Sequence, residues 1–152
     1  MNINTNKVAQ FQQLFDTIGE APNFDAMELR INLLQEELDE LKEAFLQGNM
    51  FEIADAYGDI LFLTLGGILK NGLEPKFEAI FDEICDSNLS KADDTLCDAL
   101  KTRDKYLELN IETYFQLNPN FNKYVTYRKS DGKVLKSHNY NAVNLEQFVT
   151  NV

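Results

Sequence analysis

The chain has 152 residues, 44% of them hydrophobic, which is enough for one domain with an apolar core. Its 25 acidic residues outnumber its 14 basic residues and give a net charge of −11. This charge argues against a general nucleic-acid binder, which needs a basic surface, but leaves open acidic mimicry of DNA or a small anionic substrate held through a metal ion.

The N-terminal part of the sequence favours helices. Apolar residues recur with the helical period over residues 8–18, and a second helix follows that ends before Gly48, a natural C-terminal cap. A third helix is predicted for residues 50–70, and a fourth opens at Glu74 and ends near Asn88. Four helices joined by short links predict a mainly α, four-helix-bundle-like core.

The C-terminal part of the sequence has a different pattern. Residues 95–109 favour another helix, whereas residues 112–115 and 123–128 alternate in the manner of strands. The pair Asp131-Gly132 is a strong turn signal before residues 133–136. We therefore expect a small C-terminal antiparallel β appendage.

We expect a single domain over the whole chain, with a helical core at residues 1–91 and a helix plus β-hairpin extension at residues 92–152. Cys85 and Cys97 match neither a disulfide framework nor a zinc pattern, and the N-terminus has no apolar signal core. The most apolar helix carries two aspartates in its first half, which argues against a membrane span. These features predict a cytoplasmic protein with reduced thiols and no membrane partner.

Three carboxylates share one face of the second helix. Glu40 follows Glu36 by four residues and Glu37 by three, so all three side chains project from the same side, beside the apolar stripe. Asp39 points elsewhere and is expected to be solvated. Taken alone, a run of acids like this is more typical of a solvated helix face than of a binding site.

The third helix repeats the acidic pattern in an apolar setting. Glu52, Asp55 and Asp59 share a face, and the rest of the helix is apolar almost all round, as is typical of a buried helix. An unpaired buried carboxylate is strongly disfavoured, so we expect a cation among them. The short glycine-containing turn predicts that the two helices pack antiparallel, which brings their acidic faces together.

An all-oxygen set of ligands favours Mg²⁺ or Mn²⁺ over zinc or copper. Such ions activate a water molecule and hold the attacked phosphate, while a carboxylate that does not bind metal serves as general base. A di-iron carboxylate bundle needs Glu-Xaa-Xaa-His on two helices, but the one histidine, His138, lies far along the chain. No EF-hand loop is present. The alternative is an acidic helical interaction protein without catalysis.

The motif Glu36-Glu37-Xaa-Xaa-Glu40, followed by Glu52-Xaa-Xaa-Asp55, resembles the signature of the all-α nucleoside triphosphate pyrophosphohydrolases. This superfamily includes MazG-like proteins, dimeric dUTPases and phosphoribosyl-ATP pyrophosphohydrolase. The resemblance implies hydrolysis of a nucleoside triphosphate to the monophosphate and pyrophosphate. It also implies Mg²⁺ dependence, with Mn²⁺ as a substitute, and a homodimer or a dimer of dimers.

Two later segments extend the resemblance. Residues 81–91 look like the segment after the last bundle helix of one MazG-like branch, and residues 131–140 look like its C-terminal element. The link between Glu40 and Glu52 is short for the superfamily, so the turn must be tight. Residues 92–127 form a longer insertion than the simplest members carry, and its role is open between a lid, a base-reading element and a dimer contact.

The resemblance also assigns roles to individual residues. It implies that Glu36 positions or deprotonates the attacking water and that the metal is bound by Glu37, Glu40, Glu52 and Asp55. Independently of the resemblance, Asp59 is a candidate for a further ligand or for a hydrogen-bond acceptor behind the ligands. The residues expected to contact the nucleotide are Asn88, Lys91, Lys133, Lys136 and Tyr140. The expected role is sanitising of the nucleotide pool, with a deoxynucleotide as substrate. Pyrimidine deoxynucleotides, oxidised purines and phosphoribosyl-ATP all stay open, and phosphoribosyl-ATP is the least expected of the three.

Overall fold

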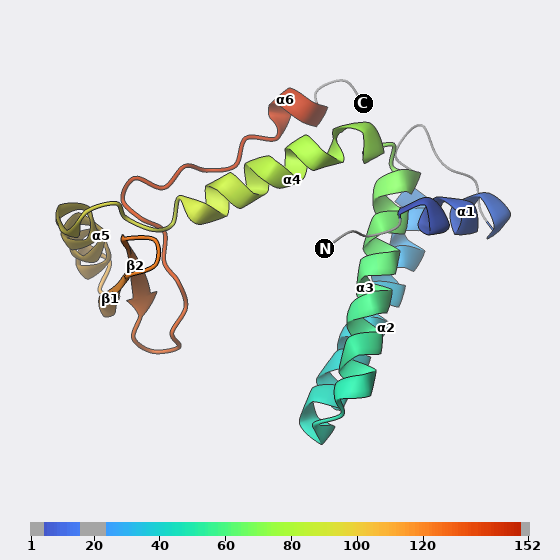
Figure 1. The fold of residues 1–152 in the computed structure, drawn as a ribbon, viewed down its shortest axis with the longest axis horizontal. Helices are drawn as coiled ribbons and strands as arrows, with labels where there is room; N and C mark the ends of the chain where they lie inside the picture. The colour runs from blue at the N-terminus through green and yellow to red at the C-terminus, as the bar shows by residue number, and fades with distance from the viewer. Residues whose placement is uncertain (1–4, 16–23, 150–152) are drawn as a thin grey trace. The chain divides into compact units, whose positions relative to one another are not determined.

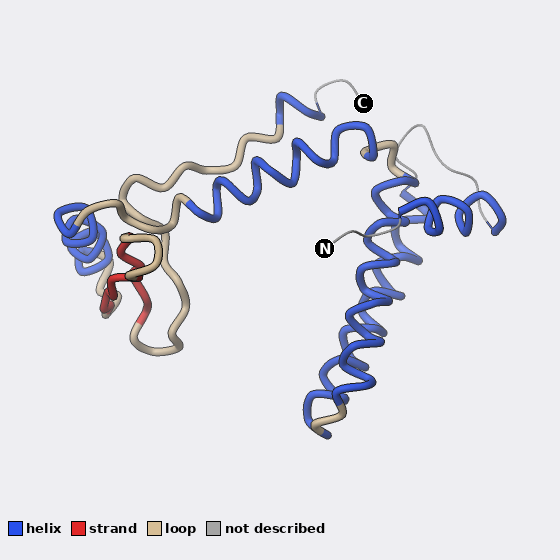
Figure 2. Tube along the Cα trace, in the orientation of Figure 1, coloured by secondary structure: helices blue, strands red, loops and turns tan. Residues whose placement is uncertain are grey.

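The computed structural model describes residues 5–15 and 24–149, which contain six helices and one two-stranded antiparallel sheet (Figures 1 and 2). The helices are α1 (Thr5–Phe15), α2 (Phe24–Gln47), α3 (Met50–Lys70), α4 (Glu74–Leu89), α5 (Leu96–Glu108) and α6 (Glu146–Val149), and the strands are β1 (Thr113–Asn118) and β2 (Lys123–Arg128). The prediction of a mainly α fold with a small C-terminal β appendage is confirmed. The predicted end of the first helix, residues 16–18, lies outside the described residues.

The chain divides into two compact units between Glu78 and Ala79, inside α4. The single domain expected from the sequence stays a prediction. No helix in the described ranges is long and apolar enough to cross a membrane. The cytoplasmic location also stays a prediction.

A two-residue turn joins α2 to α3 and folds them into an antiparallel hairpin (Figure 1). Gly48 has a φ of +66°, a conformation that glycine adopts without a steric penalty, and its N–H donates to the Phe45 carbonyl at 3.1 Å. The Asn49 side chain then caps α3 by accepting hydrogen bonds from the N–H groups of Phe51 and Glu52. The predicted tight turn is therefore present, and it sets the register of the two acidic faces.

Farther along the hairpin, a glycine of α3 makes room for side chains from the neighbouring helices. The Arg30 side chain crosses α3, where Nη1 donates a hydrogen bond to the Leu63 carbonyl at 2.8 Å. A Cβ atom at Gly66 would lie 2.7 Å from Arg30 Nη1 and 2.7 Å from Nε2 of the buried Gln12 on α1. Gly66 thus leaves room for polar side chains from both neighbouring helices.

Much of the apolar surface of this first unit is exposed. On α2, Ile31, Leu38 and Phe45 follow one another at intervals of seven residues and are 61%, 48% and 73% exposed. On α3, Tyr57 is 61% exposed. The expectation that α3 is buried on all sides is therefore wrong for this chain, because among the described helices only α1 and α2 pack extensively against it.

In the second unit, α5 packs against both strands of the hairpin β1–β2. The strands pair antiparallel, and the ring of Tyr114 stacks on that of Tyr127 with centroids 5.2 Å apart. The predicted turn at Gly132 is present, with a φ of +71°. It returns Val134 to Tyr127 as an isolated antiparallel bridge, so the segment after the turn does not form a third strand.

Candidate functional site

The acidic faces of α2 and α3 lie on the same hairpin, and charges from both helices act on one carboxyl group, that of Glu37. The pKa of Glu37 is raised above its ordinary value, first by partial burial and then by the negative charges of Glu40, Asp59, Asp55 and Glu36. Nearby like charges disfavour ionisation of a carboxyl group, so these four acids lie close enough to act on Glu37. Asp59 raises this pKa more than Asp55 does.

Glu52 lies near the turn end of the same hairpin. Together with Glu40 it lines a pocket of about 400 Å³, which is also bordered by Glu43, Gln47 and Asn49. Glu52 stands in the first turn of α3, where the helix dipole favours a negative charge. Sequence reasoning missed Glu43, although its position three residues after Glu40 places it on the same helical face.

These acids differ from the sequence expectation in their burial. Glu37 is half-buried, whereas Glu52, Asp55 and Asp59 are exposed, so the argument that burial demands a cation on α3 is wrong. Among the described residues, no three His, Cys, Asp or Glu side chains converge closely enough to hold a metal ion. A bound cation is instead favoured by the repulsion among the carboxylates around Glu37. Their oxygen atoms are the ligands that Mg²⁺ or Mn²⁺ prefers.

Four of the five residues predicted to contact the nucleotide lie together in the second unit. Lys91 Nζ donates to Asn88 Oδ1 at 2.6 Å, and Lys136 Nζ lies 4.3 Å from the centroid of the Tyr140 ring. The Tyr140 hydroxyl lies 2.9 Å from Ser87 Oγ. This hydrogen bond and the positive charges of Lys136 and Lys91 lower the pKa of Tyr140.

The fifth residue, Lys133, lies apart from these contacts, at the turn after β2. Its N–H donates to Asp131 Oδ1 at 3.1 Å, and its carbonyl accepts from the Arg128 N–H at 2.9 Å. The Arg128 side chain also pairs with Asp131, and this pairing lowers the pKa of Asp131 to about 2. The turn is thus held by its own ion pair.

Two serines that sequence reasoning did not single out hold the chain beside Tyr140. Ser87 Oγ donates to the Asn141 carbonyl at 2.9 Å, and Ser90 Oγ accepts from the Asn141 N–H at 3.0 Å. Both serines belong to the segment 81–91 that carried the resemblance, so its pattern was the available signal. The sequence prediction named mainly charged and amide side chains in these segments and did not include the two serines.

A comparison with sequence models of protein families matches residues 8–88 to the phosphoribosyl-ATP pyrophosphohydrolase family. The match covers 81 of the 152 residues and contains both acidic faces of the hairpin. No match was found among curated proteins. The family match indicates a pyrophosphohydrolase that acts on a nucleotide-like substrate. The chain belongs to the phosphoribosyl-ATP pyrophosphohydrolase family, within the MazG-like all-α NTP pyrophosphohydrolase superfamily.

Proposed function

We propose that this protein hydrolyses a nucleoside triphosphate, with a deoxynucleotide as the expected substrate, in a Mg²⁺-dependent reaction that removes non-standard or excess nucleotides. The observation that carries the proposal is the crowding of acids from two helices around Glu37, inside the range that matches the family. Like charges at short range destabilise the folded protein unless a cation offsets them. A cluster of this kind is typical of a functional site.

In the proposed site, Glu37, Glu40, Glu52 and Asp55 hold the metal, and Asp59 is a further ligand or orients one. Bound Mg²⁺ would supply positive charge that offsets the charge of the phosphates and favours ionisation of water. Glu36 positions the attacking water and takes its proton. The water oxygen forms a bond to the α-phosphorus, the bond from that phosphorus to the bridging oxygen breaks, and pyrophosphate leaves with the β- and γ-phosphates.

The cluster around Tyr140 is proposed to bind the nucleotide itself. Lys91 and Lys136 are ammonium groups in a chain poor in cations, and ammonium groups bind phosphate oxygens. Asn88 supplies an amide beside Lys91, and Tyr140 offers a ring on which a base can stack. Lys133, at the turn after β2, is proposed to add a further positive charge.

We further propose that the protein is a homodimer or a dimer of dimers, in which a second copy covers the α2 stripe of Ile31, Leu38 and Phe45. Exposed apolar areas of this kind mark interaction sites. Replacing Phe45 by Glu should shift the protein to the monomer in analytical ultracentrifugation. The matched control is Leu107→Glu, whose side chain is 67% exposed in the other unit and should leave the oligomer intact. A wild-type protein that sediments as a monomer would contradict this proposal.

The reaction is tested by incubating the protein and Mg²⁺ with a panel of nucleoside triphosphates and separating pyrophosphate from orthophosphate. Pyrophosphate released in equal amount with the matching monophosphate supports the proposal, and the best substrate identifies the base and sugar. Release of orthophosphate alone, or no release with either Mg²⁺ or Mn²⁺, would instead favour an acidic helical interaction protein without catalysis.

A further inference from the structure

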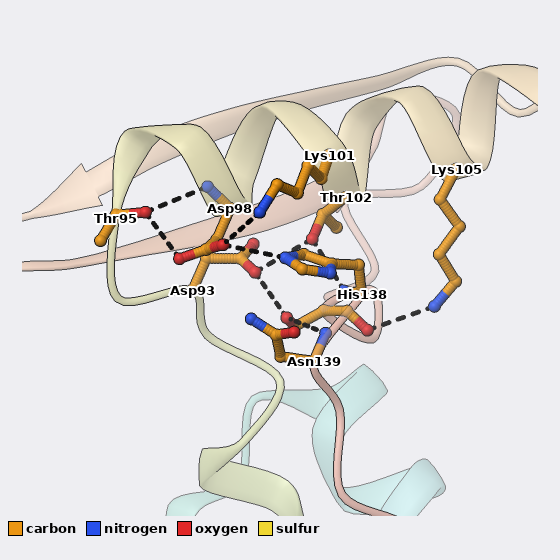
Figure 3. Close-up of polar contacts among 9 residues, drawn as sticks. Asp93, Thr95, Asp98, Lys101, Thr102, Lys105, His138 and Asn139 are labelled. Atoms are coloured by element: carbon orange, nitrogen blue, oxygen red, sulfur yellow. Dashed lines mark hydrogen bonds and ion pairs between the residues drawn. The ribbon is translucent and has the colours of Figure 1, made fainter.

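Asp93 is a buried carboxylate at the start of the insertion, outside both clusters described above. Asp93 is 1% exposed, and its Oδ1 accepts a hydrogen bond from Ser137 Oγ at 2.5 Å. The same oxygen accepts a second one from Thr102 Oγ1 at 3.0 Å (Figure 3). The Asp93 backbone pairs with Tyr124 of β2 through two hydrogen bonds of 2.8 Å. Asp93 therefore connects β2, α5 and the segment that follows the turn at Gly132.

The two hydroxyl groups that donate to Asp93 also accept hydrogen bonds from the backbone of that segment. A carboxylate only accepts hydrogen bonds, and each hydroxyl group has one proton to donate. The protons of Thr102 Oγ1 and Ser137 Oγ both point to Asp93, so these two oxygens can only accept hydrogen bonds from other groups. Thr102 Oγ1 accepts from the His138 N–H, and Ser137 Oγ accepts from the Asn139 N–H, each at 2.9 Å (Figure 3). One carboxylate thus sets the orientation of two successive peptide groups.

The next turn of α5 holds the backbone of Lys136 and Ser137, also through side-chain hydrogen bonds. The buried Tyr106 hydroxyl donates to the Lys136 carbonyl at 3.0 Å and accepts from the Lys136 N–H at 3.1 Å. Lys105 Nζ donates to the Ser137 carbonyl at 3.2 Å, and the same carbonyl accepts from the Tyr140 N–H. The backbone between Lys136 and Tyr140 is therefore fixed mainly from α5.

We propose that α5, through Thr102 and Tyr106 together with Asp93, positions Lys136 and Tyr140 for nucleotide binding. This inference rests on the proposed function, in which these two residues contact the substrate. A segment already held in its binding conformation does not have to be ordered when the nucleotide binds, so affinity increases without any new contact to it. The inserted helix is thus a support for the binding segment and not a lid, because a lid has to open.

The test replaces Thr102 by Val, which keeps the shape and removes the hydroxyl, and by Ser, which keeps the hydroxyl. Both variants and the wild type are assayed for pyrophosphate release with Mg²⁺ and the best triphosphate of the panel. Thr102→Val removes two hydrogen bonds, the one to Asp93 and the one from the His138 N–H, and should raise KM about tenfold while changing kcat less than about twofold. Thr102→Ser should retain the wild-type KM. A cooperative melting transition close to that of the wild type verifies that the variants are folded.

Because Thr102 is fully buried, Tyr106→Phe is assayed alongside it and is judged by the same criteria if Thr102→Val fails to fold. An unchanged KM, a loss in kcat alone, or a Thr102→Ser variant as impaired as Thr102→Val would refute the positioning role and leave the proposed function standing. A wild-type protein that releases no pyrophosphate would refute the proposed function, and this inference with it.

Discussion

The carboxylates on the α2–α3 hairpin and the carboxylate of Asp93 lie in opposite surroundings. Around Glu37, four further acids raise its pKa, and all four are exposed. Asp93 is buried, and one of its oxygens accepts two hydrogen bonds from hydroxyl groups. Crowded like charges destabilise the fold, whereas the hydroxyl groups bound to Asp93 hold neighbouring backbone N–H groups in place. The comparison indicates that the hairpin acids are suited to bind a ligand and that Asp93 is suited to hold the structure.

Neutralising one hairpin acid tests this difference with the largest expected effect. Glu37→Gln should lower kcat/KM for the triphosphate by more than about 100-fold. Loss of a metal ligand should reduce activity at least as much as loss of a group that only orients a ligand. The matched control is Asp39→Asn, a change of the same charge on the exposed side of α2, which should retain wild-type activity. Equal activity of the two variants would place the reaction elsewhere.

Adding Mg²⁺ should reverse the effect of the same variant on stability. Without metal, Glu37→Gln relieves repulsion and should raise the melting temperature at pH 7. With free Mg²⁺ about a hundredfold above its Kd, the wild type should gain about 2.7 kcal/mol, and the variant should gain much less. Equal gains for the wild type and the variant would exclude Glu37 as a ligand.

The pH dependence of the metal-free protein follows from the direction of the Glu37 pKa shift. The folded state binds this proton more tightly than the unfolded state, so the free energy of unfolding falls as pH rises from about 4.5 through the raised pKa. Urea titrations from pH 4 to pH 7 should therefore show a smaller loss of stability in Glu37→Gln than in the wild type. Parallel curves would contradict the crowding of charge at this site.

The second unit should respond to pH in the opposite direction. Asp98 accepts hydrogen bonds from Thr95, His138 and Lys101, and these lower its pKa to about 2 (Figure 3). Its contribution to stability is therefore present above pH 3.8 and is lost as pH falls to about 2. Asp98→Asn should melt below the wild type at pH 7, and the difference should vanish near pH 2. The exposed Asp94→Asn is the control, with a small effect expected at both pH values.

The smallest predicted effect is a difference in stability between alanine substitutions at two glycines of α3. Gly58 has open space where a Cβ atom would stand, so Gly58→Ala should stabilise the protein by about 0.5–1 kcal/mol through helix propensity. In Gly66→Ala the new Cβ atom would lie 2.7 Å from Arg30 Nη1 and from Gln12 Nε2. Displacing these two side chains should cancel the gain in stability. Urea denaturation of both variants measures the difference. Equal stabilisation would show that the crossing of Arg30 over α3 does not depend on this glycine.

Local sequence signals were sufficient for the helical hairpin. The bounds of α3, the glycine turn at Gly48 and the cap at Asn49 depend on residues within a few positions of one another, because backbone conformation and capping are local. The spacing of the acids carried the superfamily resemblance, which the match to residues 8–88 confirmed. Their gathering around Glu37 also followed from helical spacing and a short turn.

Exposure and the long-range hydrogen bonds were decided only by the tertiary structure. The apolar pattern of α3 predicted burial, but burial depends on which other helices cover it, and Asp55 and Asp59 are exposed in this chain. The role of Asp93 had no local signal, because its partner Ser137 lies 44 positions away in the sequence. A hydrogen bond needs atoms within about 3 Å of one another, and only the packing of α5 between distant segments brings these groups together.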